Sequence, residues 1–345
     1  MRFDFDTVRR TLGAIARRIN WRVTTAALAV LVVLGPAGEP GIAQTGDEIL
    51  QVLIREHRLN GAQAAALASI MSRYQGIWRT AASIARHPVT EEQCRAEILN
   101  AGFLPRRIQE ENICGHPYMV PIYPAGSSPN QAPVCIDQFE FPNLPCRYPL
   151  TWVSALDAAR MCEAMGKRLC DAHEWEGACA GSLGPPDYNF GMSSEAARSI
   201  HNRVRDIVWA YGRQRRGDIC AFGVAKSPDC DRANQTGRGV IEACGPNTYP
   251  AGYFTQCVSR FGVYDLHGNA AEHMNLPTSP DEMTSRGGLG VTEMKGSWFA
   301  FPATVEERVH PDDCRWRAPG WHRSRIADPR SHQNYHLGFR CCASR

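Results

Sequence analysis

The sequence lacks the short motifs that mark many common enzymes. It has no Gly-x-Ser-x-Gly turn for a nucleophilic serine, no glycine-rich phosphate loop and no His-Glu-x-x-His helix. The nearest approach to the last, His173-Glu-Trp-Glu-Gly177, has no second histidine to complete a zinc site. Hydrolase and nucleotide-binding functions therefore have no support in the sequence.

Charge of one sign is also scarce. The formal net charge is only +3, and the arginines are scattered apart from a short run at Arg213, Arg215 and Arg216. No predicted helix carries a basic stripe with aromatic residues between the charges. These features exclude nucleic acid as the expected partner.

Long hydrophobic runs are missing. The N-terminus has an apolar run from about residue 26 to 34, whereas a span across a bilayer needs about 20 residues. Arginines precede this run, and a polar segment follows Ala43. We predict an export signal in residues 1–43, cleaved near Ala43, or else an uncleaved N-terminal anchor, which would be the only link to a membrane. The preceding arginines are Arg9, Arg10, Arg17, Arg18 and Arg22.

Cysteine, by contrast, is abundant. All 14 cysteines lie beyond the predicted signal, and no two are spaced as Cys-x-x-Cys. In an exported chain this pattern predicts a disulfide framework in place of a structural zinc site, and a periplasmic or secreted location. The adjacent pair Cys341-Cys342 could instead form a strained redox bridge, although neighbouring cysteines usually pair with other partners.

Residues 47–112 have the pattern of a helical segment. Apolar residues recur at spacings of three and four up to about Arg86, and Asn60-Gly61 divides the run into two helices. A third helix is predicted from Thr90 to Asn100. The apolar stripe should pack on the main domain, or else form a docking surface for another envelope protein. Its members are Leu67, Ile70, Met71, Tyr74, Trp78 and Ala81.

The remainder, residues 117–345, alternates short helices with irregular segments. Residues 117–149 are rich in Pro, Gly, Ser and Asn, which predicts few strands. A helix is expected over 154–165, and a second starts at Asp171, where Glu174 completes a capping box. Residues 181–262 form a long polar stretch that disulfides would have to hold. The pattern alone indicates an irregular, cross-linked α+β fold.

Five blocks of this region, in order, resemble the formylglycine-generating enzyme (sulfatase-modifying factor) family over roughly residues 133–342. The resemblance implies a C-type-lectin-like α+β fold. The blocks are Gly166-Lys-Arg-Leu169, Glu174-Trp-Glu176, Phe261-Gly-Val-Tyr-Asp-Leu-His-Gly-Asn-Ala-Ala-Glu-His273, Lys295-Gly-Ser-Trp298 and Gly338-Phe-Arg-Cys-Cys342.

The family's copper centre is not matched. The resemblance implies two thiols that bind Cu(I) after the block ending at Trp298, because this soft ion prefers sulfur ligands. Here the first position is Ala300 and the second falls near Val309, and no cysteine lies between Trp298 and Asp313. We therefore expect neither bound copper nor copper oxidase activity.

The family's structural cysteines do have counterparts. The resemblance implies the bridges Cys162–Cys341 and Cys179–Cys314. Each would close a loop of more than a hundred residues and contribute about 4 to 5 kcal/mol in the chain-entropy model. Proximity along the chain suggests further pairs: Cys170 with Cys342, Cys244 with Cys257, Cys220 with Cys230, Cys135 with Cys146, and Cys94 with Cys114.

The resemblance also implies a structural Ca²⁺ ion, because hard oxygen donors in a tight turn suit this ion. Its ligands would be the side chains of Asp265 and Glu272 and the carbonyls of Gly268 and Ala270. Alternatively, Asp265 and Asn269 satisfy only turn amides. The family's Trp-Glu-Trp has become Ala271-Glu272-His273 here, so the aromatic wall beside the turn is lost.

Two further sets of residues complete the predicted sites. Ser297, Trp298, Trp316 and His322 could line a ligand cleft. His310, His322, His332 and His336 cluster near the C-terminus and could hold iron or copper, or could be ordinary surface and capping residues.

Two functions follow from these features. The first is an exported module that binds or scaffolds a protein or glycan ligand in the cell envelope, with structural calcium and no copper. The second is a metal-dependent oxidase, with non-haem iron or copper on different ligands of the same scaffold.

Overall fold

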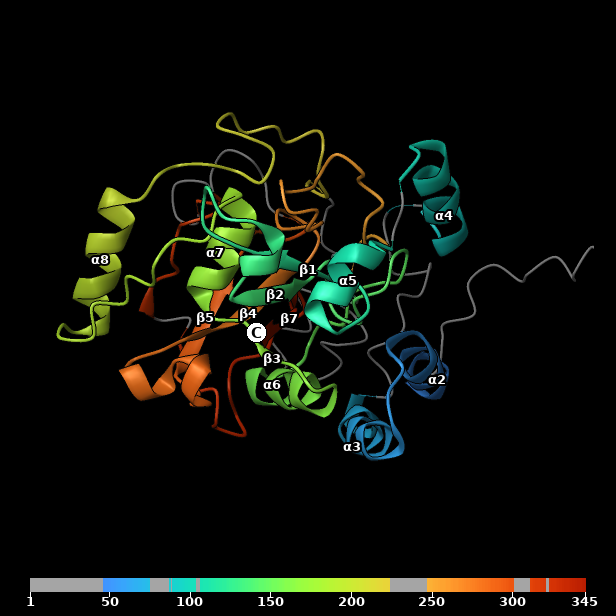
Figure 1. Cartoon of the computed structure of the whole chain (residues 1–345), viewed down its shortest axis with the longest axis horizontal. Coiled ribbons are helices and arrows are strands. Elements are labelled where there is room, and N and C mark those ends of the chain that lie inside the picture. Colours follow the sequence, from blue (N-terminus) through green and yellow to red (C-terminus); the bar gives the residue numbers. More distant parts are fainter. Residues whose placement is uncertain are drawn as a thin grey trace, which may run out of the picture. The chain divides into compact units, whose positions relative to one another are not determined.

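A computed structural model describes residues 46–74, 87, 89–103, 106–223, 247–300, 311–320 and 323–345. The predicted export signal lies outside these residues. Within them, no helix is long and apolar enough to cross a membrane. Figure 1 shows the short strands surrounded by helices and by long irregular connections.

The N-terminal part of the described chain is helical, as predicted. Helix α2 covers Gly46–His57 and α3 covers Gly61–Met71, extended by the 3-10 turn η1 (Ser72–Tyr74). Asn60 caps α3 in a capping box with Gln63, which confirms the break between the two helices. Helix α4 (Glu91–Asn100) confirms the third predicted helix, and Thr90 caps it. The short helix α5 (Ile108–Cys114) was not predicted.

Helices α2 and α3 share the core of the main domain. Leu67, Ile70 and Met71 belong to the same buried cluster as Phe139 and Met161. The buried His57 also places Nε2 3.0 Å from the carbonyl oxygen of Pro142. The predicted packing of the stripe on the domain is confirmed for these three residues, while the side chains of Tyr74, Trp78 and Ala81 lie outside the described set.

Two small sheets form the centre of the domain. The first has the antiparallel order β1-β2-β7-β3, and the second has the order β5-β4-β6 with β4 and β6 parallel. The strands are β1 (Met119–Ile122), β2 (Val134–Asp137), β3 (Arg168–Leu169), β4 (Ala271–Leu276), β5 (Val291–Lys295), β6 (Leu337–Phe339) and β7 (Cys341–Ser344).

Residues 117–149, predicted to hold few strands, contain two short strands, β1 and β2, which the sequence pattern did not locate. Every residue of both strands is buried, so neither shows the alternation of apolar and polar residues that a half-exposed strand would show. Pro121 in β1 further masked the signal. Two short strands were therefore overlooked in a segment dominated by turn residues.

Three more helices follow in the described chain, and α6 and α7 contact the sheets. Helix α6 (Ala155–Ala164) begins after its cap Ser154, and α7 (Ala172–Ala180) begins after Asp171 with the predicted capping box to Glu174. Helix α7 contacts strands of both sheets. Helix α8 (Ser194–Val204) lies within the stretch predicted as a long polar loop, which corrects that prediction. Short 3-10 turns are η2 (Pro129–Gln131), η3 (Pro280–Glu282) and η4 (Thr284–Arg286).

Six disulfides join the described cysteines. Cys162–Cys341 and Cys179–Cys314, the pairs implied by the resemblance, are present with Sγ–Sγ distances of 1.99 and 2.02 Å. Cys170–Cys342 is also present, so the two adjacent cysteines pair outward with different helix ends. Strand β7 is thereby tied to α6 and to Cys170, two residues before α7.

The other pairings predicted from proximity were wrong. The structure joins Cys94 with Cys146, Cys114 with Cys135, and Cys220 with Cys257. Helix α4 packs against the segment around Cys146, so its cysteine meets a partner 52 residues away and not the nearest one along the chain. Cys230 and Cys244 lie outside the described residues.

Arg340 connects the two sheets at their centre. It lies between β6 and β7 and is fully buried. Its guanidinium donates two hydrogen bonds to Glu272 on β4, at 2.6 and 2.7 Å, and others to the carbonyls of Asp137 and Tyr264. One ion pair thus holds both sheets beside the predicted calcium turn.

Candidate functional site

The turn from Asp265 to Glu272 has a backbone that few residues tolerate. Asp265, Gly268 and Asn269 all have positive φ, which favours Gly, Asn and Asp. At Gly268 a Cβ atom would collide with the carbonyl of Ala221. The Asn269 side chain accepts from Tyr249 N–H at 2.7 Å and donates to Glu140 at 2.6 Å. Hydrogen bonds to segments distant in the sequence therefore position the turn.

Three buried carboxyl groups lie around this turn. Glu140 accepts from the backbone N–H of Ala270 at 2.8 Å, Asp265 accepts from Gly252 N–H at 2.6 Å, and Glu272 accepts from Arg340 and from Trp175 Nε1. Each residue is at most 2% exposed. We call Glu140, Asp265, Glu272 and Arg340 the acid-rich cluster.

The pKa values of the acid-rich cluster reflect its excess of carboxyl groups over positive charge. Burial raises the pKa of Asp265 to about 7. Burial and the neighbouring Asp265 and Glu272 carboxylates raise the pKa of Glu140 well above its usual value. Burial also raises the pKa of Glu272, although Arg340 opposes the shift. Three acids facing one guanidinium either keep protons or attract another cation.

The donor chemistry of this cluster fits a hard cation in part. Carboxylates and turn carbonyls are oxygen donors, and the excess negative charge favours a divalent ion. Glu272 fits less well, because both of its oxygens already accept hydrogen bonds from Arg340. The predicted ligands Asp265, Gly268, Ala270 and Glu272 share this turn and its flanking strand.

A second cluster, here called the balanced cluster, contains the buried Glu176, His201, Lys295 and Arg317 and the exposed Asp187. Lys295 and Arg317 bind Glu176 at 2.6 and 2.9 Å, and Arg317 also binds Asp187 at 2.6 Å. Although burial alone would raise it, these cations lower the pKa of Glu176 to about 2. Here the charges satisfy one another.

Sets of potential metal ligands come together at three places in the described chain, and each has another explanation. Cys179 and Cys314 approach His267, but the two sulfurs form a disulfide. Cys170 and Cys342 beside Glu174 are also bridged. The third set, Glu176, Asp187 and His201, belongs to the balanced cluster. Disulfide sulfurs are not thiolate ligands, so none of these sets is a thiolate metal centre.

The block Lys295-Gly-Ser-Trp298 follows strand β5 and packs against the turn. Ser297 Oγ accepts from Gly268 N–H at 2.9 Å. Ala300, where the first copper thiol would lie, packs beside the clusters of Trp298 and Phe299. Val309 lies outside the described residues. All cysteines within them are bridged.

The residues predicted to line a cleft are mostly core. Ser297, Trp298 and Trp316 are 1%, 8% and 7% exposed, and both tryptophans belong to one buried cluster. Trp298 stacks on His336 with ring centroids 4.5 Å apart. His322 lies outside the described residues.

The predicted histidine cluster is only partly described. His332 packs edge-on against His273 at 6.4 Å, whereas His336 stacks on Trp298. The described chain brings no three histidine nitrogens together as metal ligands. His310 and His322 lie outside it, so the alternative iron or copper site stays a prediction.

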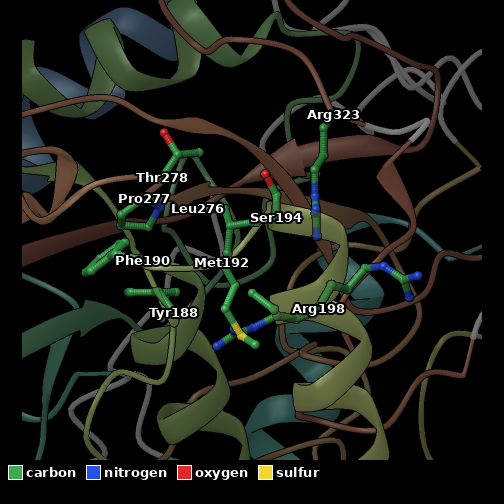
Figure 2. Close-up of a pocket in the computed structure, with 11 residues that line it drawn as sticks. Tyr188, Phe190, Met192, Ser194, Arg198, Leu276, Pro277, Thr278 and Arg323 are labelled. Carbon is green, nitrogen blue, oxygen red and sulfur yellow. The ribbon is translucent and has the colours of Figure 1, made fainter.

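A small cavity of about 30 Å³ lies between helix α8 and the end of strand β4. Figure 2 shows the rings of Tyr188 and Phe190 on one side of it and the cationic side chains of Arg198 and Arg323 on the other. It holds little more than one water molecule, so it is no substrate site.

Sequence reasoning overlooked Glu140 and assigned no role to Arg340 or Lys295. Arg340 and Lys295 each lie inside a block that carries the family resemblance. A charged residue beside apolar neighbours in such a block could have indicated a buried ion pair. Glu140 gave no such signal, because its role depends on contact with Ala270, 130 positions away.

The fold and site define a class: a disulfide-linked α+β domain with two small sheets and a buried polar turn. Residues 61–345 match the family described as the Sulfatase-modifying factor enzyme 1-like domain. The chain belongs to this family, whose match begins within the helical segment, at α3.

Two solved structures are similar to this chain at low identity. CarF is 14% identical, with a TM-score of 0.33, over 74% of this chain and 84% of CarF. Treponema denticola variable protein 1 is 12% identical, with a TM-score of 0.31, over 74% of this chain and 82% of that protein. No curated protein matches the sequence.

Proposed function

We propose that this family member is an exported binding or scaffolding module without copper oxidase activity. The observation that carries the proposal is the loss of sulfur beside Trp298. Ala300 and Val309 stand where two thiols would bind Cu(I), and all described cysteines are in disulfides. Carbon side chains offer no ligand to a soft ion.

A binding role is consistent with a cross-linked centre that carries long irregular connections. Six disulfides and the buried ion pairs of Arg340 and Lys295 brace the centre, while long irregular connections lie around it (Figure 1). A rigid base that presents loops suits recognition of a protein or glycan partner in the cell envelope.

Calcium is proposed as a structural ion at the acid-rich cluster. Asp265 and Glu272, with the carbonyls of Gly268 and Ala270, would hold it, and the ion would supply positive charge. The support is the excess of buried acid over base. The ion would fix the turn that packs on Ser297.

Export to the periplasm or outside the cell is proposed from the N-terminal pattern of residues 1–43. The six described disulfides fit an oxidising compartment. N-terminal sequencing of the protein recovered from the envelope fraction tests cleavage near Ala43. An intact Met1 would instead support an anchor.

The deciding experiment incubates the purified protein with a Cys-x-Pro-x-Arg peptide, copper and oxygen. We expect no aldehyde by mass spectrometry and no copper at stoichiometry. Aldehyde formation would refute the proposal. Iron or copper at one per chain, lost on substitution of His332 and His336, would favour the oxidase alternative.

A further inference from the structure

A cavity of about 580 Å³ lies beside the start of the calcium turn, but none of the predicted calcium ligands lines it. Its walls come from the segment around α5 and the loop before Asp265, and the residues relevant here are Phe103, Gln138, Ser259, Arg260 and Tyr264. This size falls within the range of about 300–1,000 Å³ typical of small-molecule sites.

Gln138, which lines this cavity, has an unpaired side chain. It is 1% exposed, and neither Nε2 nor Oε1 has a hydrogen-bond partner. Its backbone is fixed, because its N–H donates to Tyr118 and its carbonyl accepts from Tyr264 N–H, both at 2.9 Å. A buried amide without partners is costly and rare in native proteins, so its partner should arrive through the cavity.

The other lining groups indicate the chemistry of that partner. The rings of Phe103 and Tyr264 lie 4.7 Å apart and supply an apolar wall. Arg106 is neutralised by Glu111, and Arg107 by Glu110. Arg260 is exposed and has no ion pair with any described residue, so it supplies one uncompensated positive charge.

We propose that this cavity binds an acidic sugar unit, a hexuronate carried by a glycan. A pair of neighbouring hydroxyls can both donate to Oε1 and accept from Nε2 of Gln138. The aromatic wall suits the C–H face of a sugar ring, and Arg260 suits its carboxylate. Recognition here uses no calcium ligand, which separates this site from the acid-rich cluster.

Hexuronate is one ligand class for the binding function proposed above, and the proposal depends on that function only to this extent. If no hexuronate binds, a protein partner on another surface remains testable by the peptide and metal experiments above. If aldehyde forms in those experiments, hexuronate binding here still stands.

Calorimetric titration of the full exported chain with glucuronate tests the site, with glucose and acetate as matched probes. We expect glucuronate to bind at millimolar concentrations or better, glucose about tenfold more weakly and acetate not at all. The same result is expected in EDTA. Equal affinity for glucose, equal affinity for acetate, no binding, or loss in EDTA would each overturn the proposal.

Two variants test the residues. Gln138→Met should reduce glucuronate affinity at least about tenfold while leaving the melting temperature unchanged or higher, because it removes an unpaired amide. A lower melting temperature would mean that the amide has an internal partner, which would contradict the proposal.

Arg260→Gln should reduce glucuronate affinity about tenfold and leave glucose affinity unchanged. Arg203→Gln, at an exposed arginine on α8 that does not line the cavity, is the control and should change neither. An equal loss of glucuronate affinity in Arg260→Gln and Arg203→Gln would indicate a general charge effect and refute the role of Arg260.

Discussion

The two charge clusters combine similar types of charged side chain, but the pKa values of their carboxyl groups shift in opposite directions. In the balanced cluster, Lys295 and Arg317 surround Glu176 and lower its pKa to about 2, against the opposing effect of burial. In the acid-rich cluster, Arg340 alone faces three carboxyl groups, and burial raises the pKa of Asp265 to about 7. The charges of the balanced cluster compensate one another, whereas the acid-rich cluster has an excess of carboxyl groups that another cation could compensate.

The two clusters therefore differ in whether they need a ligand. The balanced cluster ties β5 to α7 and needs no ligand. The acid-rich cluster lies in the turn that contacts Ser297, so a cation there would affect the surroundings of Trp298. In the proposed function, calcium would then stabilise a scaffold that has Ala300 and Val309 where the resemblance implies copper thiols.

Removal of the long bridges should have the largest effect. The variant Cys162→Ala/Cys341→Ala should lower the free energy of unfolding by about 5 kcal/mol, and Cys114→Ala/Cys135→Ala by about 3 kcal/mol, because the loops span 179 and 21 residues. Denaturant unfolding measures both. Equal losses would show that native strain, and not loop length, sets the stability.

Arg317→Met should come next and lower the free energy of unfolding by about 3–5 kcal/mol, because it leaves the buried Glu176 with less positive charge around it. The matched control is Arg203→Met on the exposed face of α8, with an expected change within about 0.5 kcal/mol. A small loss in Arg317→Met would mean that Lys295 alone balances the cluster.

Sequence patterns predicted the helices better than the strands or the charge clusters. Capping residues such as Thr90 and Asp171 act locally, so they marked α4 and α7. Strands β1 and β2 are buried on both faces, so they lack the alternation of apolar and polar residues that would have indicated a strand. Glu140 and Gln138 acquire their roles from partners and a cavity formed by distant segments, which no local pattern reports.

The pH dependence should differ in sign between the clusters. The folded protein holds the Asp265 proton more tightly than the unfolded chain does, with a pKa of about 7 against 3.8. Without calcium, this group therefore lowers the unfolding free energy as pH rises from about 4 to 7. Glu176, with a folded pKa of about 2, contributes stability above pH 4.5 that is lost toward pH 2.

Asp265→Asn isolates this effect. Asparagine retains an acceptor for Gly252 N–H and tolerates the positive φ. At pH 8 without calcium, we expect the variant to be more stable than the wild type by on the order of 1–2 kcal/mol. Chemical unfolding at pH 5 and pH 8 measures it, and an equal pH slope in both proteins would exclude Asp265 as the source.

Calcium should stabilise the wild type by about 2.7 kcal/mol at a free concentration one hundred times the Kd, which is less than the loss expected for Arg317→Met. Thermal unfolding in calcium and in EDTA measures this difference, and Asp265→Asn should lose it. A calcium effect of equal size in the variant would place the ion elsewhere.

Metal analysis of the purified, copper-treated protein tests the central claim most directly, with the aldehyde assay run on the same sample. We predict calcium bound, copper and iron at background and unmodified peptide. One copper or iron per chain together with oxygen-dependent aldehyde would contradict a binding module without an oxidase centre.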